Sequence, residues 1–359
     1  MATEPVAAAK KLACDLVCEG GGVKGIGLAG AFEALEQTGY TPNHSAGTSA
    51  GAITAALIAA GYSAADLKDV VFNMDFTQFE DETWQDKFPG AFGKGLSIAM
   101  VTGVYRGDAF LEWIRAKLAA KGVHFFSDLR TDSDDPRYAY KLQVIVSDVS
   151  SRQLLVLPRD APVLGLDPDK LEVALAVRMS MSIPLFFEPI RIQNGQTNHV
   201  HVLVDGGMLS NFPVWLFDTD PNDPPECPTF GLLLVEPDPK TPITARIPAP
   251  EHSPKGLHGL VQLLSGCLHT MMEAHDRLYV EKAQFARTIG IPTLGIGTTE
   301  FGITPERKQA LYDSGREAAA KFLSTWDFDA YVAEFRSGKE HSRRGDIAAE
   351  LKAAATTPV

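Results

Sequence analysis

Residues 44–51 read His44-Ser45-Ala46-Gly47-Thr48-Ser49-Ala50-Gly51, and an Ala- and Ile-rich run follows to Ala60. The pattern predicts a short strand, a sharp turn and a helix, with G-x-S-x-G at the turn. Small residues on both sides let the chain turn tightly, so that the Ser49 oxygen is exposed at the helix N-terminus, where the helix dipole favours developing negative charge. Ser49 is therefore a candidate nucleophile, and the residues that frame it are Gly47, Thr48, Ala50 and Gly51. A tight helix start without catalysis is the alternative that these residues leave open.

A second glycine-rich turn precedes this one, between the apolar run Asp15–Cys18 and a predicted helix with Leu28, Phe32 and Leu35 at helical spacing. Consecutive glycines leave backbone N–H groups unshielded, and these can converge on a phosphate or on the oxyanion of a tetrahedral intermediate. The candidate anion-binding residues are Gly20, Gly21, Gly22, Val23, Lys24 and Gly25.

The same turn also satisfies the G-x-G-x-x-G pattern of dinucleotide-binding domains. That fold expects an acidic residue about 20 positions later to hold the ribose hydroxyls. The corresponding stretch Tyr40–Ser45 contains no carboxylate, and the chain has no G-x-x-x-x-G-K-[ST] sequence. We therefore disfavour a nucleotide and expect no cofactor, although a non-catalytic protein that binds an anion or nucleotide at this turn stays as the alternative from another class.

The third motif is Asp205-Gly206-Gly207, directly after the apolar strand predicted over Val200–Val204. A carboxylate at a strand end, next to two glycines, can lie close to a substrate and accept a proton. Alone, the motif also fits a solvated aspartate in a turn. His199 and His201 share the strand face of Asp205 and allow a Ser-His-Asp triad, but edge or surface histidines are the simpler interpretation.

A metal site has weak support in the sequence. His269 and Glu273 are four residues apart on a predicted helix and could supply two ligands, but the sequence offers no third ligand. A solvated polar helix face is the better interpretation, and we expect no catalytic metal.

Taken in order, the glycine-rich turn, G-x-S-x-G and D-G-G motifs resemble those of the patatin-like phospholipase family. The resemblance extends to Met179-Ser180-Met181-Ser182-Ile183-Pro184-Leu185-Phe186-Phe187 before D-G-G and to Asn211-Phe212-Pro213 after it. It covers residues 12–235 clearly. It implies an α/β fold, with a three-layer αβα core and a mostly parallel central sheet flanked by helices.

The resemblance also implies the chemistry, which is that of a phospholipase A-like lipid acyl hydrolase with a Ser–Asp dyad. Ser49 would attack the acyl ester and Asp205 would take its proton, while the N–H groups of Gly21, Gly22 and Val23 would stabilise the oxyanion. Water would then release the fatty acid. An enzyme that stays silent until a partner or effector activates it is an alternative within this class. One departure is Lys24, where the family usually has arginine, since lysine keeps the charge but not the bidentate fork.

We predict one domain over residues 12–330, a loose arm over 1–11 and a flexible tail over 336–359. The proline-rich segment Glu236–Pro254 is predicted as coil. We expect the aromatic stretch Asn73–Arg106 to be either a lid or binding loop, or an apolar segment covered by the rest of the protein. Two segments are candidates for contacting an acyl chain: this stretch and the Leu- and Met-rich helix face from Leu257.

The formal net charge of -12 and the isoelectric point of about 5.2 argue against nucleic-acid binding and diffuse adhesion to anionic membranes. We expect an acyl-lipid or phospholipid substrate reached by local membrane contact. The four cysteines have no zinc-finger spacing, which favours reduced cytosolic thiols. With no signal-peptide core after Met1 and too few large apolar residues for a span in Ser45–Ala65, we predict a cytoplasmic protein that is peripheral at membranes. A homodimer is one possible assembly.

Overall fold

The structure is a computed structural model that describes residues 12–79, 105–219, 225–235, 282–298, 300 and 302–336. The predicted arm, the proline-rich segment, the helix from Leu257 with His269 and Glu273, most of the aromatic stretch and nearly all of the predicted tail lie outside these residues. The division into one domain over 12–330 stays a prediction.

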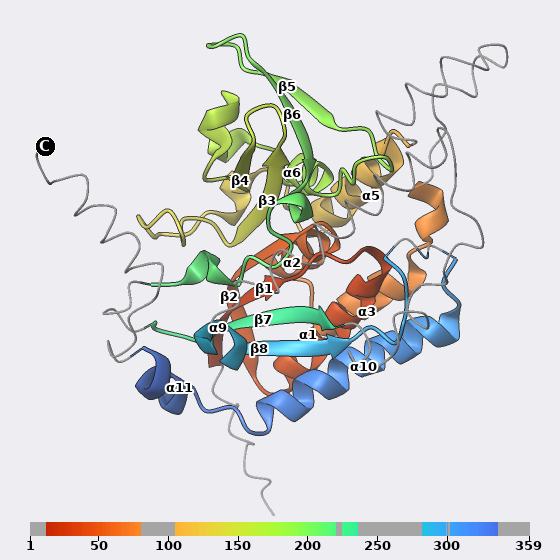
Figure 1. The fold of residues 1–359 in the computed structure, drawn as a ribbon, viewed down its shortest axis with the longest axis vertical. Helices are drawn as coiled ribbons and strands as arrows, with labels where there is room; N and C mark the ends of the chain where they lie inside the picture. Colours follow the sequence, from red (N-terminus) through yellow and green to blue (C-terminus); the bar gives the residue numbers. More distant parts are fainter. Residues whose placement is uncertain are drawn as a thin grey trace, which may run out of the picture.

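A mixed sheet forms the centre of the molecule (Figure 1). Its order is β5-β6-β3-β2-β1-β7-β8, and β4 pairs with β3 off this path. The five strands from β3 to β8 run parallel, whereas β4, β6 and β5 are antiparallel to their neighbours. The strands are β1 Leu12–Cys18, β2 Tyr40–Thr48, β3 Leu142–Asp148, β4 Gln153–Leu157, β5 Ile190–Gln193, β6 Val200–Asp205, β7 Thr229–Val235 and β8 Thr288–Pro292.

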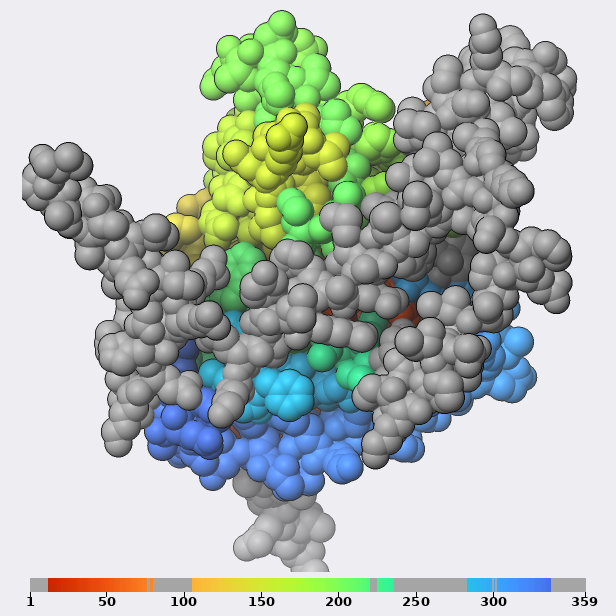
Figure 2. Space-filling view, in the orientation of Figure 1, coloured from red at the N-terminus to blue at the C-terminus, as the bar shows by residue number. Residues whose placement is uncertain are grey.

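Helices flank this sheet, which confirms the predicted three-layer α/β core. The α-helices are α1 Ile26–Gln37, α2 Ala50–Ala59, α3 Ala64–Asn73, α5 Asp108–Ala119, α6 Val173–Ser180, α9 Lys282–Ala286, α10 Pro305–Leu323 and α11 Phe328–Phe335. In the space-filling view, the β5–β6 hairpin in green protrudes at one end and α10 in blue lies along the other (Figure 2).

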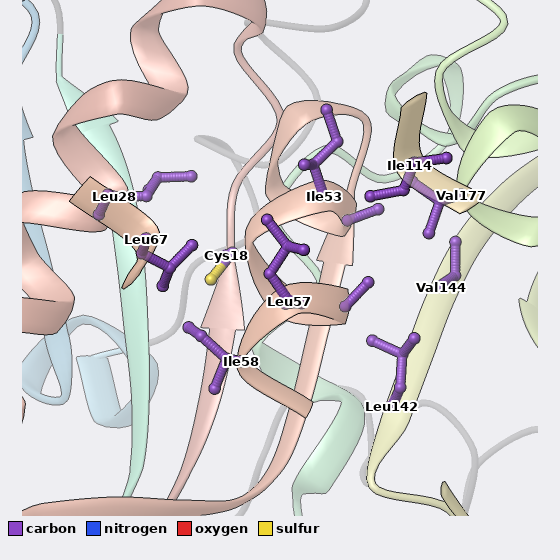
Figure 3. Close-up of a cluster of buried hydrophobic side chains, with 14 of the residues drawn as sticks. Cys18, Leu28, Ile53, Leu57, Ile58, Leu67, Ile114, Leu142, Val144 and Val177 are labelled. Carbon is purple, nitrogen blue, oxygen red and sulfur yellow. The ribbon is translucent and has the colours of Figure 1, made fainter. Parts of the chain in front are cut away.

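The main core lies on the face of the sheet that carries α1, α2, α3, α5, α6 and α10. Figure 3 shows Cys18 from β1 and Val144 from β3 beside Leu57 from α2 and Val177 from α6. A smaller cluster lies on the opposite face, where Phe217 of a short 3-10 helix packs against residues of β1, β2 and β3. Because side chains alternate along a strand, both faces of these central strands are buried.

Local signals decide several boundaries. The S-x-x-D sequence Ser63–Asp66 forms a reciprocal capping box at the start of α3. Thr304 caps α10 and Pro305 opens it, which determines where this helix begins. α6 begins only at Val173, because Pro168–Lys170 form a separate 3-10 turn. None of the helices described is both long and apolar enough to cross a bilayer.

Helices α1 and α10 cross with backbones in close contact. A Cβ placed on Gly30 would lie 1.9 Å from the Tyr312 carbonyl oxygen, and one placed on Gly315 would lie 1.9 Å from that of Gly27. Any side chain at these positions would force the helices apart. This crossing supports the edge of the sheet that carries β8.

We expect Gly315→Ala to lower the free energy of unfolding by about 1–3 kcal/mol, because overpacking outweighs the better helix propensity of alanine. Gly302→Ala is the matched control, since nothing lies within 4 Å of a Cβ there. Urea denaturation of both variants measures the difference. Equal stability of the two variants would contradict the close crossing.

Candidate active site

Ser49 lies between β2 and α2 in a strained backbone conformation, with φ of 52° and ψ of -125°. A non-glycine residue rarely adopts positive φ, and such strain persists only where the surroundings enforce it. Glycine is required on both sides of Ser49, because a larger residue would clash with the backbone. A Cβ on Gly47 would lie 2.3 Å from the Gly51 carbonyl oxygen, and one on Gly51 would lie 2.2 Å from that of Cys18. The strand, turn and helix predicted from the G-x-S-x-G pattern are therefore present.

Asp205 ends β6, and the sheet brings it to the same place. Asp205 is opposite Val146 of β3, while the neighbouring Ile145 pairs with Thr48 of β2, the residue before Ser49. Both Ser49 and Asp205 are fully buried. Residues that are 156 positions apart (205 − 49) thus meet across neighbouring strands.

The electrostatics of Asp205 are unusual for an aspartate. Burial raises its pKa to about 7, although the Ser49 hydroxyl and the Gly207 N–H group both lower it. One carboxyl oxygen, Oδ1, accepts a hydrogen bond from Gly207 N at 2.8 Å. Oδ2 is buried without a hydrogen bond in the described part of the chain. Gly206 allows the chain to turn here, because a Cβ would lie 2.3 Å from the Ile145 carbonyl oxygen.

The Ser49 hydroxyl reaches two groups. It lowers the pKa of the Asp205 carboxyl by hydrogen bonding, and its Oγ also contacts the sulfur of Met181 at 3.5 Å. Thioether sulfur is a weak acceptor, so the Asp205 carboxyl is the stronger of the two acceptors within reach.

The glycine-rich turn lies directly against Ser49. A Cβ on Gly20 would lie 3.1 Å from Ser49 Cβ and 2.2 Å from Asn211 Oδ1, and Gly22 adopts a positive φ of 56°. Val23 N donates to the Thr298 carbonyl oxygen at 3.1 Å. Two further backbone N–H groups of the turn are engaged. Gly20 N donates to the Asn211 carbonyl oxygen and Lys24 N to that of Gly21, both at 3.1 Å.

Two amides of the turn stay available as donors. Within the described residues, the N–H groups of Gly21 and Gly22 donate to no acceptor. Of the three donors expected from the sequence, the one on Val23 is already engaged. Lys24 and Gly25 continue into a 3-10 turn that leads to α1, and Lys24 is buried.

The two histidines are placed apart from Ser49. His201 Nδ1 lies 2.7 Å from Asp148 Oδ2, and His199 Nε2 lies 3.2 Å from Ser150 Oγ. Burial raises the pKa of Asp148, but the bonds from His201 and Ser150 outweigh that effect and hold it well below its usual range. His201 is buried on the Asp205 face, as alternation predicts, yet its partner is a different carboxylate.

A narrow apolar cavity of about 30 Å³ lies beside the Ser49 elbow. It begins at Gly22 of the glycine-rich turn and at Ala50, the residue after Ser49. Its other lining residues are Ile53, Met74, Phe79, Phe110, Met181, Ile183, Phe187 and Thr298. Among the described residues no charged side chain lines it, so it suits a hydrocarbon better than a polar group.

Sequence patterns assign no role to several residues that build this site. Ser180 and Ser182 lie in the stretch before D-G-G, and they contact the backbones of Ser49 and Asp205. Asn211 follows D-G-G and donates to the Gly20 carbonyl oxygen at 3.0 Å. Thr298 lies far beyond the three motifs, and no local signal marks it.

Comparison with known proteins identifies the family. The family model "Patatin-like phospholipase" matches residues 16–218, more than half of the chain. The chain belongs to the patatin-like phospholipase family. Membership supports lipid hydrolase activity in the broad sense for this patatin-like protein.

Curated relatives share much of the patatin-like chain. It is 36% identical over 314 residues to the uncharacterized protein YqhO of Bacillus subtilis, covering 88% of this chain and 99% of the relative. It is 23% identical over 219 residues to the uncharacterized protein R571 of Acanthamoeba polyphaga mimivirus, covering 57% and 62%.

Two solved bacterial structures resemble the patatin-like protein. VipD from Legionella pneumophila is 18% identical with a TM-score of 0.49, over 89% of this chain and 67% of VipD. The ExoU-SpcU complex from the type III secretion system of Pseudomonas aeruginosa is 19% identical with a TM-score of 0.45, over 96% of this chain and 61% of that one.

The raised pKa of Asp205 predicts a pH-dependent stability. Because the folded protein holds this proton more tightly than the unfolded chain, the Asp205 contribution disfavours folding increasingly from about pH 4 to pH 7. Asp205→Asn cannot ionise and so lacks this loss of stability. We therefore expect the difference in unfolding free energy, variant minus parent, to be larger at pH 8 than at pH 4 by on the order of 1–4 kcal/mol. Denaturant titrations at both pH values test this, and a pH-independent difference would contradict a buried, protonatable Asp205.

Proposed function

We propose that the protein is a phospholipase A-like lipid acyl hydrolase that cleaves fatty-acyl esters through Ser49 and Asp205. The observation that carries this proposal is a strained, buried serine beside a buried aspartate whose pKa is about 7. A general base works best when its pKa lies near the operating pH. A protein that only binds an anion has no use for that combination.

In the proposed reaction, the Asp205 carboxylate removes the Ser49 hydroxyl proton as Oγ attacks the ester carbonyl. The N–H groups of Gly21 and Gly22 stabilise the tetrahedral oxyanion. The intermediate then expels the alcohol portion of the lipid, which takes the proton from Asp205 and leaves an acyl-enzyme. Water attacks this ester while Asp205 accepts its proton, and the proton returns to Ser49 Oγ as the fatty acid departs.

The apolar cavity is the proposed place for the start of the acyl chain. It begins beside Gly22 and Ala50, the neighbours of the proposed oxyanion donors and nucleophile, so an acyl chain that starts there can extend along Ile53 toward Phe110. Burying each CH₂ group there contributes about 0.8 kcal/mol. We infer an acyl-lipid substrate, with a phospholipid as the main candidate, reached by local contact at a membrane surface.

A regulated form of the same enzyme is the second candidate, and specific contacts favour it. The Val23 N–H group is bonded to Thr298 and so is engaged, and the Ser49 hydroxyl is shared between the Met181 sulfur and the Asp205 carboxyl. Binding of lipid or an activator that draws Thr298 away would add Val23 to the oxyanion donors. Under this proposal, activity depends on conditions that shift these two contacts.

We expect one fluorophosphonate to attach to the parent protein at Ser49. Hydrolysis of acyl esters should require the same residue. Ser49→Ala should abolish both, and Asp205→Asn should slow them by at least about 100-fold, the range for loss of a general base. The labelling rate should rise with pH through about 7, because only the carboxylate form of Asp205 accepts the proton. Intact-protein mass and ester hydrolysis, with and without phospholipid vesicles, measure these effects.

Ser150→Ala and His199→Gln are the matched controls for the triad alternative, since they remove the other serine-histidine contact. Both should react like the parent protein. Labelling that persists in Ser49→Ala, or that disappears in Ser150→Ala, would overturn the assignment. Labelling that needs vesicles would favour the regulated enzyme.

We expect Ile53→Phe to shift the preferred substrate toward shorter acyl chains, because the added ring fills the cavity just beyond the nucleophile. Two methylene groups fewer in the preferred chain, or a drop of about tenfold in kcat/KM for the longest ester, is the expected size. Ile53→Val, which enlarges the cavity slightly, should not shorten the preference. A series of p-nitrophenyl esters gives the comparison, and an unchanged profile in Ile53→Phe would place the acyl chain elsewhere.

A further inference from the structure

The hydroxyl of Ser180 is directly bonded to the backbone of the proposed nucleophile. Ser180 ends α6, and its side chain is fully buried. Its Oγ accepts a hydrogen bond from Ser49 N at 2.9 Å and donates one to the Ile145 carbonyl oxygen at 2.6 Å. One hydroxyl therefore joins the elbow to strand β3.

The elbow needs such an acceptor. Ser49 follows the strand with a positive φ and precedes the helix, so its N–H group has no acceptor in either the sheet or the helix. A buried N–H group without an acceptor costs on the order of 1–3 kcal/mol, and the chain would relax to avoid it. Ser180 satisfies this group in the strained conformation that the elbow adopts beside Asp205.

The base is held by the same segment. Asp205 N donates to the Ser182 carbonyl oxygen at 2.9 Å, and the intervening Met181 accepts the Ser49 hydroxyl. Ser180 and Met181 thus contact Ser49, and Ser182 contacts Asp205, so three consecutive residues contact both members of the proposed dyad.

This segment is itself anchored by a buried arginine. Arg178, at 1% exposure, donates to Ser182 Oγ at 2.6 Å, to the Gly107 carbonyl oxygen at 3.1 Å and to that of Glu188 at 3.0 Å. A planar guanidinium that bonds several carbonyls fixes the end of α6 in position and orientation. The segment is therefore rigid enough to set the distance between Ser49 and Asp205.

We propose that Ser180 is a positioning residue for acyl transfer, whose hydroxyl holds the Ser49 elbow in register with Asp205. The inference rests on the proposed Ser49–Asp205 chemistry. Ser180 touches neither substrate nor the reacting oxygen, so it acts through the backbone of Ser49. Small displacements of a reacting group are enough for a large effect, since about 1 Å can reduce a rate about 100-fold.

The test compares Ser180→Ala with Ser45→Ala. Ser45 is a matched control because it is equally buried and its hydroxyl also donates to carbonyls, of Ala55 at 2.8 Å and Lys141 at 3.4 Å, away from the dyad. We expect both variants to lose similar stability in thermal unfolding. Only Ser180→Ala should lose reactivity: fluorophosphonate labelling and kcat on a p-nitrophenyl ester should fall about 10- to 100-fold, with KM changed less than about twofold.

Rescue separates positioning from general damage. Ser180→Thr keeps the hydroxyl, and we expect it to recover at least half of the kcat lost in Ser180→Ala. The hydrogen exchange of the Ser49 amide provides a readout independent of chemistry, and it should accelerate in Ser180→Ala but not in Ser45→Ala.

The outcomes distinguish this inference from the proposed function. A parent protein that reacts at Ser49, together with a Ser180→Ala variant that reacts at the parent rate, overturns the positioning role alone. A fall in kcat of equal size in Ser45→Ala also overturns it. A parent protein that takes no label and hydrolyses no ester, with or without vesicles, overturns the proposed function, and the positioning role falls with it.

Discussion

The strained backbone of Ser49 is the constraint on which the rest of the site depends. A positive φ at a residue with a side chain costs on the order of 1–3 kcal/mol and persists only if its surroundings hold it. Here β2 must end directly beneath α2, and that is possible because Gly47 and Gly51 bring backbone against backbone. The glycine-rich turn is equally close, since Gly20 lies against Ser49. The glycines of both motifs are thus required by packing before any chemistry is considered.

The buried aspartate is a second departure from the most stable arrangement. An apolar residue at the end of β6 would fit the surrounding core better than a carboxyl group whose pKa is raised by burial. Its position follows from the mixed sheet, because β6 runs antiparallel to β3 and ends opposite Val146, one residue from the Ile145–Thr48 pair that joins β3 to β2.

How much of this could be predicted depends on the range of the interactions. The strand, turn and helix around Ser49 follow from neighbouring residues, and the sequence predicts them. The capping box at Ser63 and the start of α10 are equally local. Alternation along β6 correctly places His201 and Asp205 on one face, but it carries no information that Asp148 pairs with the histidine. The hydrogen bond from Val23 to Thr298 joins residues 275 positions apart (298 − 23), and nothing local marks it. The sequence therefore indicates which residues could do chemistry, whereas the engaged and available donors appear only in the fold.

The end of α6 contacts both the strained backbone of Ser49 and the buried Asp205. Ser49 follows β2 and Asp205 ends β6, which approach the site from opposite directions, and no covalent connection shorter than 156 residues sets their separation. Ser180, the last residue of α6, and the two residues after it contact both of them, through a hydroxyl on one side and a carbonyl on the other. A helix end is well suited to this task, because its last carbonyls have no partner inside the helix and can accept hydrogen bonds from elsewhere. The relative placement of Ser49 and Asp205 therefore depends on a third element, which Arg178 anchors in the core.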